Sequence, residues 1–345
     1  MSSKSLLLLA VFVPLGLNSI LLSEIPAKPQ YGSWGFDLAG ADRSVKPGDD
    51  FFRFANGKWI NATQIPPDKP SYSLRLAMSD LIEKRLHEMM ETSAMMTKPE
   101  SPPSLSTKVG LYYRSFMDEA AVQKVGAQAI AAELGDIKKA KTREDLARLM
   151  GRTTVDFEES LFNFVIEVDL KDPNHYAFYL TQAGLGLPDR DYYLKADFAT
   201  QKAAYEKYVA TLLRLVNWPE PDARAKDILN FETSVAEASW TKAQQRDRLA
   251  IYNPMSLDEL EKHAPGFPWR QFLTEAKMEK LGRVIVAEKS AFPKLSQIYS
   301  DAPMETIAAW SAFHLADNAA PYLSKPFTDA YFELQAKTLS GQKEQ

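Results

Sequence analysis

The chain has 345 residues, of which 45% are hydrophobic and 25% charged, and its formal net charge is −4. This composition is typical of a globular protein with one large or two intermingled domains, and a slight acidic excess without a sustained basic run gives no reason to expect nucleic-acid binding. Cysteine is absent, which excludes disulfides, thiolate metal sites and a cysteine nucleophile.

The N-terminus has the layout of an export signal. A weakly positive start at residues 1–4 leads into an apolar stretch over residues 6–17. We expect residues 1–23 to be a signal peptide or, if uncleaved, a marginal membrane anchor, followed by a proline-bearing linker at 24–35. An export signal in a chain without cysteine favours a bacterial protein of the periplasm or the extracellular space. Membrane contact is expected only if the leader stays attached.

Helical patterns dominate the sequence up to residue 151. Residues 36–70 are aromatic but punctuated by glycine and proline, so irregular structure with short helices is expected there. Apolar residues then recur at helical spacing. For the last helix of this part, Thr142 is the predicted N-cap, with Asp145 three residues later. The predicted helices are 74–96, 106–117, 120–134 and 144–151.

One β-hairpin is predicted, at about 161–182. Apolar and polar residues alternate on both sides of Asp172-Pro173-Asn174, which we expect to form the turn. A short strand is predicted at 284–286. The remaining predicted helices cover residues 205–216, 223–245, 257–264, 269–278, 305–318 and 328–339. The predicted fold class is therefore mostly α, a multi-helix domain with one β-hairpin.

Several short motifs follow one another in a distinctive order. They are VKPGDDFF at 45–52, ANGKW at 55–59, LYYRS at 111–115, LGLPDRDYY at 185–193, YNPM at 252–255 and KPF at 325–327. Together they resemble the N-terminal region of the neprilysin-like M13 zinc metallopeptidases, over residues 36–345. The resemblance implies that residues 66–345 form the helical lid domain that roofs the family's substrate chamber. It also implies that residues 36–65 pack on a catalytic domain, without which the aromatic side chains at 51–59 lack a partner.

In that family the zinc ligands lie in a C-terminal half that contains a His-Glu-x-x-His helix. Here the histidines are scattered, and the nearest match, which starts at His87, has Glu91 in place of the second histidine. We therefore expect no catalytic residue and no metal ligand in this chain, and zinc only in the full-length family. The sequence ends at Gln345, close to where this region ends in family members. We expect a fragment whose partner is the missing C-terminal catalytic domain.

The function that the resemblance implies is the N-terminal part of an exported zinc-dependent metalloendopeptidase, which cleaves oligopeptides and is inactive without its other half. Family members place an arginine shortly after the Ile-Pro step, where it contributes to binding of the substrate's C-terminal carboxylate. Arg75 is the residue of this chain nearest to that position. A second hypothesis is a stand-alone, non-catalytic helical module that binds peptides or regulates another protein.

Three polar groups each have a structural and a functional interpretation. His87 and Glu91, one helical turn apart, are either a solvated stripe or part of a metal site that still needs a third ligand. His314 with Asp317 is either a hydrogen-bonded structural pair or a ligand pair. Arg190, between two aspartates, either fixes its loop by pairing with carboxylates or binds an anion. We expect the structural interpretation for each.

Overall fold

The computed structural model describes residues 38–96, 102–155 and 160–344. It divides into two compact units, one ending at Ile65 and one beginning at Pro66. Helices dominate, and the second unit also contains a small four-stranded sheet, which confirms the predicted fold class. The predicted leader and linker, residues 1–35, lie outside the described residues. Of the helices described, none combines the length and the apolar character that crossing a membrane requires.

The first unit contains the 3-10 helix η1 (Leu38–Gly40) and helix α1 (Phe51–Ala62). Asp50 caps α1, because its side chain accepts a hydrogen bond from the backbone N–H of Arg53 at 2.9 Å. The loop before the helix folds back onto it through a bond of 2.9 Å from the Asp42 N–H to the Phe54 carbonyl. Phe51 and Phe52 remain 68% and 67% exposed. These two aromatic side chains are therefore largely unburied within the first unit.

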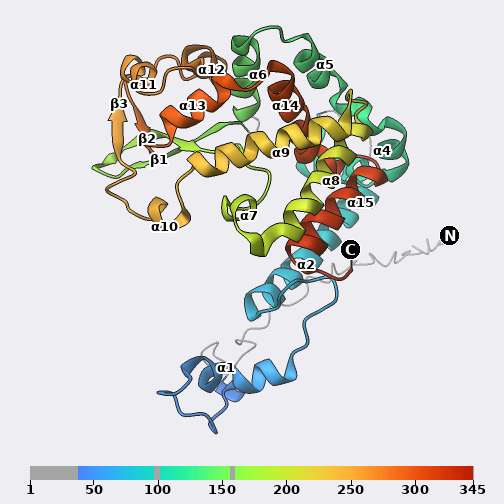
Figure 1. Ribbon diagram of the computed structural model, residues 1–345. Coiled ribbons are helices and arrows are strands. Elements are labelled where there is room, and N and C mark those ends of the chain that lie inside the picture. The colour runs from blue at the N-terminus through green and yellow to red at the C-terminus, as the bar shows by residue number, and fades with distance from the viewer. Residues whose placement is uncertain (1–37, 97–101, 156–159, 345) are drawn as a thin grey trace, which may run out of the picture. The chain divides into compact units, whose positions relative to one another are not determined.

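The second unit is predominantly helical (Figure 1). In that view α11, α12 and α13 gather beside β3, whereas α8 and α15 lie toward the opposite end, and α9 runs between the two groups. Its helices are α2 (Leu74–Met96), α3 (Leu105–Phe116), α4 (Glu119–Val125), η2 (Gly126–Ile130), α5 (Ala131–Lys139), α6 (Arg143–Val155), α7 (Asp191–Leu194), η3 (Ala196–Phe198), α8 (Ala199–Leu215), α9 (Pro221–Ala238), α10 (Lys242–Gln245), α11 (Leu257–His263), α12 (Trp269–Glu275), α13 (Phe292–Asp301), α14 (Met304–Ala319), η4 (Ala320–Tyr322), α15 (Lys325–Tyr331) and the π-helix η5 (Phe332–Leu339).

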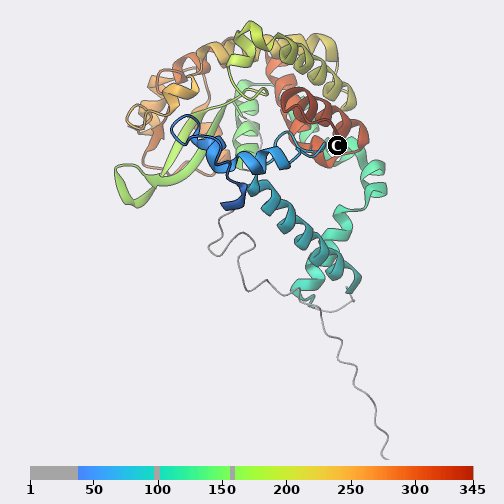
Figure 2. The ribbon, with the colours of Figure 1, turned by 90° about the horizontal axis from the view of Figure 1, so that it is seen from below.

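The sheet has the strand order β1-β2-β4-β3. Strands β1 (Phe162–Asp169) and β2 (Asp172–Gln182) form the predicted antiparallel hairpin. Strand β4 (Val284–Val286), also predicted, runs parallel to β2 and pairs with only two of its residues, and β3 (Asn253–Met255) adds an antiparallel edge. The distal half of the hairpin therefore extends past the rest of the sheet, and in Figures 1 and 2 its tip projects beyond the helices.

The hairpin turn is not where the sequence predicts it. Asp172, Pro173 and Asn174 belong to β2, and the chain reverses at Leu170 and Lys171 instead. The reason is local hydrogen bonding: the Asp169 carboxylate accepts from the Lys171 N–H at 2.9 Å and closes the tighter turn. A register shift between Val168 and Asp169 accompanies it. The Asp-Pro-Asn signal was therefore assigned to the wrong side of the reversal.

Two predicted helices are each divided in the structure. The 120–134 prediction becomes α4, η2 and α5, because Gly126 adopts a φ of 51° that ends α4. The 223–245 prediction becomes α9 and α10, and the Gln182 side chain bonds both backbone groups of Trp240 between them. The predicted cap of α6 is confirmed, because Thr142 and Asp145 accept from each other's backbone N–H. Helix α13 was not predicted.

The core of the second unit is a continuous apolar cluster that includes α8, α9, α12, α13 and α14. Near the start of the hairpin it is aromatic. Phe162 of β1 lies with its ring centroid 4.4 Å from that of Trp269 and 4.9 Å from those of Phe267 and Phe292. These tilted and edge-on contacts add to the burial of large apolar side chains. They anchor the base of the hairpin in the helical core.

The close approach of α6 and α12 at Gly151 predicts that an added methyl group destabilises the fold strongly. A Cβ at Gly151 of α6 would lie 2.1 Å from the backbone carbonyl oxygen of Phe272 in α12. We expect Gly151→Ala to destabilise the fold by about 3 kcal/mol, because backbone atoms must move apart. Gly135→Ala in α5 is the matched control, since a Cβ there meets no atom within 4 Å, and it should stabilise by about 0.5–1 kcal/mol. Urea midpoints test both, and equal midpoints for the two variants would refute the close contact.

Candidate functional site

The histidines of the chain lie on separate elements. His87 is on α2, His175 on β2, His263 on α11 and His314 on α14. His87 Nε2 lies 3.0 Å from Glu91 Oε1, and both side chains are about half exposed. The Tyr113 ring of α3 packs edge-on against the His87 ring. Within the described ranges, no group of three or more histidine or carboxylate side chains is arranged to hold a metal ion.

His314 belongs to a buried hydrogen-bond network around Glu232 of α9. Glu232 Oε1 accepts from Trp310 Nε1 at 3.0 Å and from His314 Nε2 at 2.9 Å. Its Oε2 accepts from the hydroxyls of Tyr193 at 2.7 Å and Tyr205 at 2.8 Å. Glu232 is fully buried. The structure confirms that His314 is a hydrogen-bonded structural residue, because its Nε2 bonds the buried Glu232 carboxylate. Asp317, on the same helix, accepts from the Tyr208 hydroxyl at 2.5 Å.

The protonation state of this Glu232 network favours a structural role. Burial, followed by the negative charge of Glu232, raises the pKa of Tyr193 and of Tyr205 well above the ordinary value. Both phenols therefore stay protonated and act as hydrogen-bond donors to the carboxylate. The sequence held a signal for this network: Glu232 stands at a position of α9 that shares its face with buried Ile228, Leu229, Val235 and Ala236. An acidic residue in an apolar stripe indicates buried partners.

Arg190 fixes its loop, but by a different contact from the one predicted. Its Nε donates to the backbone carbonyl of Ala236 in α9 at 2.9 Å. The flanking aspartates pair with lysines, Asp189 with Lys242 at 3.3 Å and Asp191 with Lys195 at 2.7 Å. Arg190 thus holds its loop against the C-terminal end of α9. The two flanking aspartates, which were the predicted partners of Arg190, form ion pairs with lysines instead.

Arg75 lies in the first turn of α2, and its side chain is exposed. The backbone N–H of Leu76 donates to the Ser73 hydroxyl at 3.3 Å, which places Ser73 at the start of the helix. The last described residues of the chain contact the loop before α2, because the N–H groups of Lys343 and Glu344 both donate to the carbonyl of Pro67 at 3.2 Å. The C-terminal residues therefore lie against the segment that precedes α2 in the second unit.

One candidate interaction surface is formed by α2 and α3. Not one residue of the 23 in α2 is buried, although the helix carries apolar side chains at helical spacing. We call the exposed apolar stripes of the two helices the α2–α3 face. Large exposed apolar patches are rare on monomeric proteins, so these apolar side chains mark a candidate docking surface. Its residues are Met78, Ile82, Leu86 and Met89 of α2 and Leu105, Val109, Tyr112 and Phe116 of α3.

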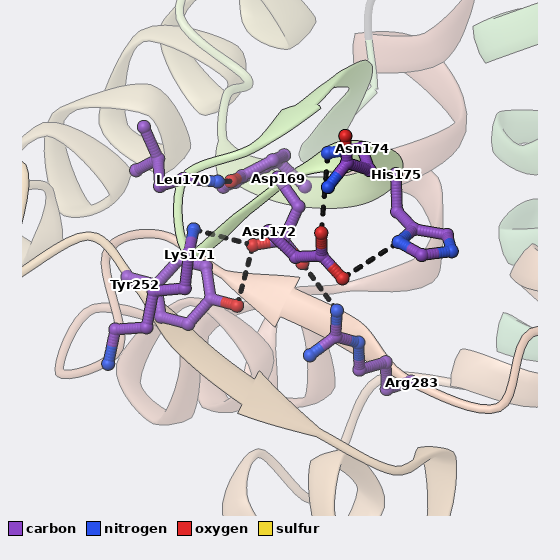
Figure 3. Close-up of polar contacts among 9 residues, drawn as sticks. Asp169, Leu170, Lys171, Asp172, Asn174, His175, Tyr252 and Arg283 are labelled. Atoms are coloured by element: carbon purple, nitrogen blue, oxygen red, sulfur yellow. Dashed lines mark hydrogen bonds and ion pairs between the residues drawn. The ribbon is translucent and has the colours of Figure 1, made fainter.

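A second polar cluster holds the tip of the hairpin (Figure 3). Asp169, whose side chain is buried, accepts from the Tyr252 hydroxyl at 2.8 Å and forms an ion pair with Arg283. The Leu170 N–H donates to the Tyr179 hydroxyl at 3.1 Å. The pKa of Asp169 is lowered chiefly by the hydrogen bond from the Lys171 N–H, although burial opposes this effect. The hydrogen bond from the Tyr252 hydroxyl and the positive charge of Arg283 lower it further. The cluster ties the turn to the loops before β3 and β4.

This cluster predicts a pH-dependent contribution to stability. A carboxyl whose pKa is lower in the folded state stabilises the fold above its unfolded pKa, near 4, and loses that effect as the pH falls further. Asp169→Asn should therefore lower the urea midpoint at pH 7, and the gap to the unmodified protein should narrow below about pH 4. Glu279→Gln, at an exposed position in the loop before Arg283, should show no gap at either pH. A gap for Asp169→Asn that stays constant down to pH 3 would contradict the ionised pair.

Comparison with known proteins gives consistent relatives. A sequence model of peptidase family M13 matches residues 47–345. Rat endothelin-converting enzyme-like 1 is 27% identical over 326 residues, which is 89% of this chain and 41% of the relative. Human endothelin-converting enzyme 1 is 24% identical over 307 residues, covering 85% of this chain and 39% of the relative. The chain thus spans about two-fifths of the length of these relatives.

Two solved structures share the fold. The inhibitor complex of the zinc metalloprotease Zmp1 from Mycobacterium tuberculosis superposes with a TM-score of 0.82 at 26% identity, over 90% of this chain and 48% of that one. PepO from Lactobacillus rhamnosis gives a TM-score of 0.66 at 19% identity, over 87% of this chain and 48% of that one, which supports the fold alone. In both cases roughly half of the solved protein has no counterpart in these 345 residues.

Proposed function

The chain belongs to peptidase family M13, and from this we propose that it is the N-terminal part of an exported zinc-dependent metalloendopeptidase that cleaves oligopeptides. The observation that carries the proposal is the family match over residues 47–345, combined with coverage of only 41% of a full-length relative. The Zmp1 structure, titled a zinc metalloprotease, supports the same reaction class. We assign the peptide hydrolysis itself to the part of the full-length relatives that this chain does not cover.

Among the residues that the structure describes, the potential ligands do not fit a catalytic zinc site. Such a site needs three protein ligands around one ion, and the imidazoles here stand on α2, β2, α11 and α14. The sequence contains no His-Glu-x-x-His. We assign the zinc ligands and the general base to a C-terminal catalytic domain, and to this chain no part of the hydrolytic step. The chain should therefore be inactive alone.

Within this proposal, residues 66–345 form the lid of the substrate chamber and residues 36–65 pack on the catalytic domain. The exposed Phe51 and Phe52 support the second assignment, because a partner would remove their rings from water at about 25 cal/mol per Å². The α2–α3 face supports a further contact with the same partner. The C-terminal residues beside Pro67 would bring a following catalytic domain close to the loop that precedes α2.

The inactivity of the chain alone can be measured directly. Purified chain with added zinc should not hydrolyse an internally quenched peptide faster than buffer, because its described residues form no zinc site that could activate a water molecule. A zinc peptidase assayed in parallel confirms that the substrate is cleavable. Turnover by the chain that survives repeated purification and disappears with a chelator would overturn the proposal.

Arg75 is proposed to contribute to binding of the substrate's C-terminal carboxylate in the assembled enzyme. Its exposed guanidinium in the first turn of α2 is available for a bidentate pair. Arg75→Ala should raise KM about tenfold for a peptide with a free C-terminus and leave KM unchanged for the same peptide as its amide. Arg85→Ala, at an exposed position further along α2, is the control. Equal effects on the two peptides would exclude carboxylate recognition.

Export is part of the proposal, and its support is the apolar leader in the sequence. We place the protein in the bacterial periplasm or the extracellular space, with an uncleaved leader as the alternative that anchors it to the membrane. Fractionation of cells that express the full chain, with N-terminal sequencing of the product, separates the two. Intact Met1 in a cytoplasmic fraction would contradict export.

A further inference from the structure

Strand β1 presents a free edge whose backbone groups have a defined direction. In the described part of the chain, β1 pairs only with β2. The carbonyl of Leu180, in β2, points away from β1, because it accepts at 2.9 Å from the N–H of Ala287, the residue after β4. Its cross-strand partner Phe164 therefore points its N–H away from β2, where the Asn163 side chain accepts it at 2.8 Å. By strand alternation, Ile166 and Val168 also direct their N–H groups outward.

This edge is held in place at both ends. At the base, Phe164 packs on Phe178 with ring centroids 4.8 Å apart, next to the aromatic core around Phe162. At the tip, the Asp169 cluster ties the turn to Tyr252 and Arg283 (Figure 3). A two-stranded ribbon is only marginally stable by itself, so these anchors are what keep the projecting half in register. The edge is thus preorganised before any ligand arrives.

The side chains around the edge form an apolar surface with one charge. Ile166 and Val168 are 55% and 49% exposed on one face of β1, and Tyr176, directly opposite Val168, is 76% exposed. Glu167, between them, projects from the other face and is exposed. An exposed apolar strand edge without proline or lysine is a template for another strand. Its complement has apolar side chains at alternate positions and a basic residue between them.

We propose that the free edge of β1 binds an extended segment of an oligopeptide as an additional strand. The inference rests on the proposed function, in which this domain lines a chamber that admits oligopeptides. Backbone bonds to Ile166 and Val168 hold the segment, and alternate apolar side chains lie against Ile166, Val168 and Tyr176. The register shift after Val168 limits the regular edge to a few residues. That length suits one short peptide, and it is too short for the roughly 1,000 Å² that a stable dimer of two copies needs.

The test uses the full chain without zinc and a fluorescein-labelled peptide, Gly-Ile-Lys-Val-Lys-Ile-amide. Fluorescence anisotropy should show saturable binding, and deuterium exchange should slow in the 162–169 fragment. Ile166→Pro should weaken binding at least tenfold, because proline removes an outward N–H without breaking the ladder to β2. Ile166→Val keeps that N–H and should bind like the unmodified chain. A peptide N-methylated at two consecutive central residues, which blocks both of its edges, should not bind.

Three results would overturn the inference. The first is unchanged affinity for Ile166→Pro in a protein whose circular dichroism shows it to be folded. The second is peptide-dependent protection elsewhere, for example on α2 and α3. The third is a dimer of the free chain that Ile166→Pro abolishes, which would make a second copy the occupant of the edge. Because this assay contains no zinc and no catalytic domain, its failure leaves the turnover assays of the proposed function unaffected.

Discussion

Replacement of Glu232 by alanine is expected to destabilise the second unit by about 4 kcal/mol or more. The change leaves Tyr193, Tyr205, Trp310 and His314 without the carboxylate that accepts from each of them. Each buried donor that loses its acceptor costs about 1–3 kcal/mol, and the losses do not add fully. Since whole domains are stable by only about 5–15 kcal/mol, the variant should be largely unfolded at 37 °C.

Thermal and urea unfolding followed by circular dichroism measure this effect. Glu237→Ala is the matched control, because Glu237 lies on the same helix with an exposed side chain. It should change stability by less than about 0.5 kcal/mol. An unfolding midpoint for Glu232→Ala within error of the Glu237→Ala value would show that the Glu232 network does not hold α7, α8, α9 and α14 together.

Joining this chain to a catalytic domain is expected to produce the largest gain of function. A fusion to the part of Zmp1 that has no counterpart here should hydrolyse peptides at least about a thousandfold faster than this chain alone. The expected reason is that the partner supplies zinc-activated water while this chain closes the chamber. Activity should disappear with a chelator and return with zinc.

A variant of the fusion tests whether the α2–α3 face makes the contact. Leu86→Glu with Met89→Glu places two charges on the exposed stripe of α2, where they cost nothing in the free chain but would be buried against a partner. Turnover should fall at least tenfold. Arg85→Glu, also exposed on α2, is the control and should retain activity. A zinc-loaded fusion that turns over no faster than the chain alone would contradict the proposed pairing.

The helical fold was largely accessible from sequence because its signals are local. The 74–96 pattern matches the ends of α2, and the 161–182 alternation located the hairpin. The errors occurred where one residue overrides a pattern. Gly126 ends a helix through its positive φ, and Asp169 closes a turn that Asp-Pro-Asn was expected to form. Strand β3 was not predicted, because its Asn-Pro-Met sequence is atypical of a strand, whereas the equally short β4 consists of β-branched Val and Ile.

The interactions around the candidate sites were less accessible, because their members are distant in sequence. Glu232 contacts Trp310 and His314 across 78 and 82 residues, and Asp169 reaches Arg283 across 114. Spacing within one element cannot reveal such partners. The exposure of α2 could not be predicted from the sequence either, because an apolar stripe has the same spacing whether it packs on the core of its own domain or on another partner. Only the folded unit distinguishes the two.

The most direct test of whether this chain packs against a catalytic domain is hydrophobic-dye binding to the purified chain, with and without an isolated M13 catalytic domain. The exposed Phe51 and Phe52 and the α2–α3 face predict strong dye fluorescence or self-association of the chain alone. They also predict loss of that signal as a one-to-one complex forms in sedimentation. A monomer that neither binds the dye nor forms a complex with the catalytic domain would contradict the proposed packing and favour a stand-alone, non-catalytic module.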